Sequence, residues 1–74
     1  MTTSTSSTIE VRLNGADREI PLGLSVAGLL EWLDLNPALV VVEKNREILE
    51  RDRYGETSVE ERDVLELVHF VGGG

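Results

Sequence analysis

Three consecutive glycines, Gly72, Gly73 and Gly74, stand at the C-terminal end of the sequence, directly after an apolar run. Glycine has no side chain to pack and loses more backbone entropy on ordering than any other residue. Such a run instead carries an α-carboxylate on a thin thread, and four residues from Val71 onward extend about 13 Å. A frayed chain end is the competing interpretation. Because the run contains no polar residue, the sequence favours a flexible reactive tail at 71–74 that enters the active site of another protein.

Chemistry at this tail has to begin at the Gly74 carboxylate, with Gly73 as the residue that threads it into place. A carboxylate is a poor electrophile because its charge is spread over two oxygens, and activation by ATP supplies a better leaving group. The chain has no GxxxxGK[ST] phosphate loop, no cysteine and one histidine, His69, which we interpret as a partly exposed edge residue. The sequence therefore predicts a substrate and carrier, not an enzyme, with no bound cofactor and no metal site, ATP being used by a partner.

The charge balance restricts the classes of partner. Fourteen acidic residues against seven basic ones give a net charge of −7. Nucleic-acid binding takes most of its affinity from basic contacts to phosphate, so no nucleic-acid partner is expected. The same charge suits a partner with a basic docking surface, although solubility alone also explains it.

Residues 1–8 are polar and rich in Ser and Thr, without a basic region or an apolar core. This composition predicts a disordered leader and not a signal peptide. No stretch approaches the roughly 18 to 20 apolar residues that a membrane helix needs. We therefore expect no membrane association, a cytoplasmic location and a monomer when the protein is free.

Two strands joined by a tight turn are expected at the start of the domain. Apolar and polar residues alternate over 9–13, which is the period of a half-buried strand. Asn14-Gly15 is the strongest short hairpin signal, and 17–20 can return as the second strand before Pro21 and Gly23 end the pattern.

A helix is expected next, with Ser25 as its N-cap and an apolar stripe from Val26 to Leu33. It should end near Asp34, because the residue before a proline is pushed away from helical angles. Gly28 is interpreted as permitting close packing of the helix on the sheet. Trp32, beside the stripe, is interpreted as a lid on the edge of the core, with a place in a binding face as the alternative.

The second half of the sequence predicts three more strands. A β-branched run over 39–42 indicates a strand covered on both sides or central in the sheet, and a turn leads to a short strand at 47–49. A charged connection over 51–61, anchored by Val59 and Tyr54, precedes the last strand at 64–71.

In that last strand, Leu65 and Leu67 are expected to face the helix. Val68 and Phe70 then lie on the opposite face, where they are candidate anchors for partner proteins together with Val71 and Gly72. The alternative is that loops or a short strand cover them.

Together these elements predict an α+β domain over 9–70, a mixed sheet of four to five strands with one main helix packed on one face. This is the β-grasp, ubiquitin-like arrangement, in which the last strand is expected to lie parallel to the first in the middle of the sheet.

The sequence resembles the ThiS family of sulfur carriers. The resemblance rests on four segments that span nearly everything but the leader: Leu13-Asn14-Gly15, Ser25 to Leu30, Val41 to Asn45 and, most specifically, Asp63 to Gly74. One departure is Asn45-Arg46, where family members usually carry Asn-Gly. Arginine is poor at a position that needs positive φ, so either a different turn geometry or a longer loop is expected there.

The resemblance implies a sulfur pathway for the tail. An E1-like adenylyltransferase of the ThiF type would adenylate Gly74, sulfur from a persulfide donor would displace AMP, and thiazole synthase of the ThiG type would use the resulting thiocarboxylate in thiamin biosynthesis. Three alternatives stay open at this point: the carrier subunit of molybdopterin synthase, a ubiquitin-like protein modifier, and a plain interaction module.

Overall fold

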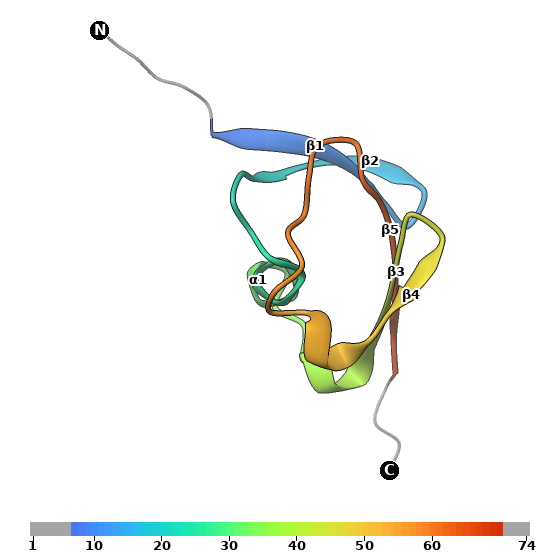
Figure 1. Cartoon of the computed structure of the whole chain (residues 1–74). Helices are drawn as coiled ribbons and strands as arrows, with labels where there is room; N and C mark the ends of the chain where they lie inside the picture. The colour runs from blue at the N-terminus through green and yellow to red at the C-terminus, as the bar shows by residue number, and fades with distance from the viewer. Residues whose placement is uncertain (1–6, 71–74) are drawn as a thin grey trace, which may run out of the picture.

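The computed structural model describes residues 7–70 as one mixed five-stranded sheet with a helix across one face (Figure 1). The elements are β1 (Thr8–Leu13), β2 (Ala16–Pro21), α1 (Val26–Trp32), η1 (Pro37–Leu39), β3 (Val40–Lys44), β4 (Glu47–Leu49), η2 (Arg51–Arg53) and β5 (Val64–His69), where η denotes a 3₁₀ helix. The strand order is β2-β1-β5-β3-β4. β5 is parallel to β1 and antiparallel to β3, which confirms the predicted β-grasp topology.

The ends of the domain differ slightly from the prediction. β1 already begins at Thr8, and the Ser7 carbonyl accepts a hydrogen bond from the Leu22 backbone N–H at 2.8 Å. Thr8, the last residue of the predicted leader, therefore belongs to β1, and Ser7 adds one hydrogen bond beyond the end of the strand. Residues 1–6 and the tail at 71–74 lie outside the described residues.

Both hairpins have two-residue turns with positive φ at both central positions. The values are +51° and +83° for Asn14 and Gly15, and +52° and +75° for Asn45 and Arg46. Such a pair of angles defines a type I′ turn, whose twist matches that of the flanking strands. The expectation of another geometry or a longer loop at Asn45-Arg46 is wrong, because the register Lys44↔Glu47 leaves only those two residues in the turn.

The two turn asparagines also hold the central strand β5. Asn14 Oδ1 accepts a hydrogen bond from the Leu67 backbone N–H at 2.7 Å, and its Nδ2 donates to the Leu67 carbonyl at 3.3 Å. Asn45 Oδ1 accepts from the Val64 N–H at 2.9 Å, and its Nδ2 donates to Asp63 Oδ1 at 3.1 Å. The Asn14 side chain thus continues the β1–β5 ladder beyond the point where the β1 backbone turns away.

Helix α1 begins as predicted and ends two residues early. The Ser25 hydroxyl accepts a hydrogen bond from the Gly28 N–H at 3.0 Å. At the other end Asp34 has a φ of +64°, and the Leu35 N–H donates to the Leu30 carbonyl at 2.8 Å. This is a Schellman termination with aspartate in the position that glycine usually occupies. The helix therefore stops at Trp32 because of Asp34 itself and not because of the later proline.

Two interpretations of helix residues need correction. Gly28 does not approach the sheet: a Cβ placed there would meet Leu24 Cδ2 and Ser25 Oγ, each at 3.4 Å. Trp32 is 45% exposed and stacks under the Arg18 guanidinium, whose Cζ lies 5.5 Å from the ring centroid. It is not a lid on the edge of the core, because it is not among the partly buried side chains that pack against the core.

The core lies between α1 and the inner face of the sheet. Its buried members are Ile9, Val11, Ile20, Val26, Leu29, Leu30, Val40, Val42, Tyr54, Val59 and Leu65. The predicted anchoring of the long connection by Tyr54 and Val59 is confirmed. Within residues 7–70, no helix is both long and apolar enough to cross a membrane.

Candidate functional site: the end of β5 and the outer face of the sheet

The predicted tail lies outside the described residues: the reactive residues Gly73 and Gly74, together with Gly72 and Val71. What the structure describes is the end of the domain from which this tail departs. β5 ends at His69, and the Phe70 N–H donates a hydrogen bond to the Leu39 carbonyl of η1 at 2.8 Å. In Figure 1 the end of β5 lies near η1, and the β3–β4 turn lies at the other end of the strand, where the Asn45 N–H donates to the Val64 carbonyl. The chain is therefore held to the domain up to Phe70.

Two side chains fix the segment to which Phe70 is bonded. Arg51 Nε donates to the Pro37 carbonyl at 3.1 Å, and the same guanidinium reaches the Val40 carbonyl with Nη2 at 3.5 Å. The buried Tyr54 hydroxyl donates to that Val40 carbonyl at 2.8 Å. Each bond comes from the long connection after β4, so this connection sets the position of η1 and, through it, of the end of β5.

The outer face of the sheet is the one turned away from α1. Leu65 is fully buried on the inner side, as predicted, whereas Val68 and Phe70 are each 53% exposed. Ile48 of β4, which the sequence reasoning did not single out, is 72% exposed. Val41 stands directly opposite Val68 in the β3–β5 pair. No loop or short strand covers Val68 and Phe70 within residues 7–70, because both remain half exposed.

A shallow hollow of about 220 Å³ lies on this face, here called the outer-face hollow. It is lined by Val41, Glu43, Ile48, Glu66 and Val68. Glu43 and Glu66 are directly opposite each other in the β3–β5 register. The hollow thus combines three apolar side chains with two carboxylates in one place.

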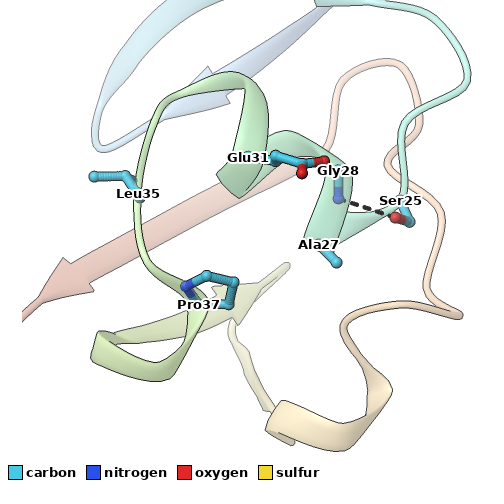
Figure 2. A pocket seen from close by; sticks show the side chains of 6 residues that line it. All are labelled: Ser25, Ala27, Gly28, Glu31, Leu35 and Pro37. Atoms are coloured by element: carbon cyan, nitrogen blue, oxygen red, sulfur yellow. Dashed lines mark hydrogen bonds between the residues drawn. The ribbon is translucent and has the colours of Figure 1, made fainter.

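A second hollow, of about 360 Å³, lies on the other side of the molecule between α1 and η1 (Figure 2). Its lining residues are Ser25, Ala27, Gly28, Glu31, Leu35 and Pro37. The Ser25 hydroxyl is engaged in capping the helix, and Glu31 is the one carboxylate in the lining. No nucleophile and base are brought together there, so this hollow is not a candidate active site.

His69 is exposed at the end of β5 and pairs with Val40 across the ladder. Its exposure is as expected, but β5 is the central strand, so His69 lies at the end of a strand and not at the edge of the sheet. Among residues 7–70 there is no group of three or more His, Cys, Asp or Glu side chains that could hold a metal ion.

Sequence reasoning did not predict that Ile48, Glu43 and Glu66 line one hollow. The signal was present in the alternation of β3 and β5, since Val41 and Glu43 share one face, as do Glu66 and Val68. Only the antiparallel register shows that the two glutamates are opposite each other. The face on which Ile48 lies could be assigned only from the position of β4, because a three-residue strand has too little alternation to indicate which residues share a face.

A β-grasp domain whose central strand leads directly into a glycine tail defines a ubiquitin-like carrier domain. A family model described as the ThiS family matches residues 11–74. The chain belongs to the ThiS family.

Relatives and solved structures agree with this assignment. The sulfur carrier protein ThiS of Bacillus subtilis is 42% identical over 65 residues, which cover 86% of this chain and 98% of that protein. The crystal structure of a thiamine biosynthesis protein (ThiS) from Geobacter metallireducens has a TM-score of 0.76 and 33% identity, over 89% of this chain and 100% of that one.

A thiazole synthase from Magnetococcus marinus is 38% identical over 66 residues. These cover 89% of this chain but only 20% of the synthase. A similar match covers 19% of the thiazole synthase of Paramagnetospirillum magneticum. The chain therefore spans about a fifth of the length of these two synthases.

Proposed function

We propose that this chain is the sulfur carrier of thiamin biosynthesis and that the Gly74 carboxylate carries the sulfur as a thiocarboxylate. Membership of the ThiS family is the observation that carries the proposal. The end of β5 supports it physically, because the domain is held by a backbone hydrogen bond at Phe70 and leaves four residues, about 13 Å of extended chain, to reach a partner's active site.

The proposed reaction begins in the active site of an E1-like adenylyltransferase. One carboxylate oxygen of Gly74 attacks the α-phosphorus of ATP, so that pyrophosphate leaves and an acyl-adenylate forms. The terminal sulfur of a persulfide then attacks the acyl carbon and AMP leaves. A thiol reduces the resulting acyl disulfide and releases the thiocarboxylate. ATP is thus a substrate that the partner enzyme consumes, and this chain is the second substrate of that enzyme and not itself an enzyme.

Thiazole synthase is the proposed acceptor of the sulfur. Segments similar to this chain occur within two proteins named as thiazole synthases, which supports an association of the two functions. The ATP-dependent activation supports a cytoplasmic location, and the net charge of −7 supports a monomeric free state through mutual repulsion.

The test is an intact-mass measurement of the purified protein after incubation with the adenylyltransferase, ATP and a persulfide source. The expected result is a shift equal to one oxygen replaced by sulfur, absent when ATP is omitted. A chain lacking Gly74 is the matched control and should not shift. An unchanged mass of the full chain, with an enzyme that activates a known carrier in parallel, would contradict the proposal. Adducts with lysines of other proteins would point to a protein modifier instead.

A further inference from the structure

The outer-face hollow has apolar side chains with no covering element among residues 7–70. α1 packs on the inner face only (Figure 1), and Ile48 is the most exposed of the large apolar side chains described. Val41 and Val68 stand beside each other across the β3–β5 pair. Apolar side chains gathered on one exposed face commonly mark a protein docking surface.

The two carboxylates of the hollow give this surface a charge preference. Like charges directly opposite each other destabilise an antiparallel strand pair, and Glu43 and Glu66 occupy such positions. The ion pairs found within residues 7–70 join Arg12 to Asp17, Lys44 to Asp63 and Arg53 to Glu56. None of these cations is paired with Glu43 or Glu66. A cation supplied from outside would therefore relieve the repulsion as well as form charge-assisted hydrogen bonds.

The mixed lining matches one kind of side chain. Lysine and arginine have an apolar stem that packs on apolar surface and a charged head that seeks carboxylates. In the outer-face hollow, Val41, Ile48 and Val68 would contact the stem while the two glutamates hold the head. Arginine, with its planar fork of donors, is the better match for two carboxylates on neighbouring strands.

The position of the hollow limits which partner can reach it. Glu66 and Val68 are on β5, the strand that leads into the tail, and only about 13 Å of extended chain separates Phe70 from the Gly74 carboxylate. An enzyme that takes Gly74 into its active site must therefore come close to this end of the sheet. The net charge of −7 makes a second copy of this chain a poor occupant.

We propose that the outer-face hollow receives an arginine or lysine side chain of the adenylating enzyme. This inference rests on the proposed function and adds to it the side-chain chemistry by which that enzyme recognises the domain. The hollow acts in docking, before the tail reacts, so it should govern the affinity for the enzyme and not the rate of the bound complex.

The test compares the full chain with Glu43→Gln/Glu66→Gln in calorimetric titrations of the adenylating enzyme without ATP, at about 50 and 300 mM NaCl. Glu31→Gln/Glu61→Gln is the matched control, since it changes the net charge equally at exposed positions away from the hollow. The expected Kd rises at least tenfold for the hollow variant at low salt and less than twofold for the control. The variant should also lose most of the salt dependence of the Kd.

A second readout separates docking from tail chemistry. In pyrophosphate-release kinetics, the hollow variant is expected to raise the KM for the carrier at least tenfold with kcat unchanged. Ile48→Ser, which removes part of the stem contact, should raise the KM as well. Thermal melting should show the glutamine variant to be at least as stable as the parent chain, because its like-charge pair is gone.

Equal Kd and KM values for the hollow variant and the control variant would overturn the inference. Sedimentation that shows a dimer of the parent chain, lost in Glu43→Gln/Glu66→Gln, would overturn it in favour of a second copy. If the parent chain binds the enzyme but is not adenylated, the proposed function fails, and the comparison of Kd values still decides the role of the hollow.

Discussion

A side chain added at Gly73 should prevent activation of the tail without affecting the folding of the domain. It lies beyond Phe70, whose N–H makes the last backbone hydrogen bond of the described chain, so we expect the domain to fold without it. Valine at this position would restrict φ and ψ and place a branched side chain in a channel shaped for bare backbone. We expect Gly73→Val to abolish pyrophosphate release with the adenylating enzyme while leaving the melting temperature unchanged. Normal release by this variant, or by a chain lacking Gly74, would contradict the role of the tail.

Arg46 and Gly15 occupy the same position in two type I′ turns, so opposite substitutions at the two positions should have opposite effects on stability. A side chain at positive φ costs roughly 1–2 kcal/mol, whereas glycine adopts this region freely. Arg46 has a φ of +75° and Gly15 a φ of +83°. We therefore expect Arg46→Gly to raise the free energy of unfolding by about 1 kcal/mol and Gly15→Ala to lower it by a similar amount, as measured by urea denaturation.

The glycine at position 15 has open space where a Cβ would be placed, so the loss in Gly15→Ala would come from the backbone and not from a clash. If Arg46→Gly lowered the free energy of unfolding, the Arg46 side chain would contribute more to stability than its positive φ costs. The sequence alone pointed to this strain at Asn45-Arg46, but the strain was expected to produce another turn geometry or a longer loop. The structure shows that Asn45, bonded to Val64 and Asp63, holds the two-residue turn in place.

At the scale of the elements, Asn14 connects the first hairpin to the strand that leads into the tail. Its side chain makes two hydrogen bonds with the backbone of Leu67. We expect Asn14→Ala to lower the free energy of unfolding by about 1–2 kcal/mol, since both bonds and a residue suited to positive φ are lost. Hydrogen exchange at the Leu67 amide should accelerate in this variant.

Asn14→Asp is the matched control, because its carboxylate still accepts from the Leu67 N–H and only the donated bond is lost. Protection of the Leu67 amide should then be kept, with a smaller loss of stability. Equal exchange rates at Leu67 in the alanine and aspartate variants would show that the side chain does not extend the ladder.

The type and order of the elements were predictable because their signals are local. Alternation over 9–13, the Asn14-Gly15 turn and the Ser25 cap each depend on a few neighbouring residues, and each is confirmed. The end of α1 was placed two residues late because aspartate at positive φ has no clear sequence signal. Trp32 was misplaced because its partner Arg18 comes from a strand distant in sequence.

At the scale of the whole molecule, the connection after β4 closes the domain between α1 and β3. The Val26 N–H donates to the Thr57 carbonyl at 2.8 Å, and the Ala27 N–H donates to the Tyr54 carbonyl at 2.9 Å. Figure 1 shows this connection passing beside α1 on its way to β5. The sequence predicted a charged surface segment with two anchors, but the pairing with the helix start depends on tertiary contacts that no local pattern contains.

Tyr54 is the residue through which this connection reaches the end of β5. Its buried hydroxyl donates to the Val40 carbonyl, next to the Leu39 carbonyl that holds Phe70. A domain of this size has a free energy of unfolding of about 4–11 kcal/mol, so one lost buried hydrogen bond is measurable. We expect Tyr54→Phe to lower the melting temperature by about 4–8 °C, equivalent to about 1 kcal/mol.

Adenylation kinetics of the Tyr54→Phe variant should show whether the hydrogen bond of the Tyr54 hydroxyl only stabilises the fold or also positions the tail. Arg51 still holds the Pro37 and Val40 carbonyls in the Tyr54→Phe variant, so η1 and the Phe70 hydrogen bond should remain in place. We therefore expect unchanged KM and kcat for adenylation at temperatures well below the melting transition. If KM rises while the folded fraction stays complete, the Tyr54 hydroxyl also sets the direction in which the chain leaves β5, because a loss of stability alone leaves the kinetics of the folded molecule unaltered.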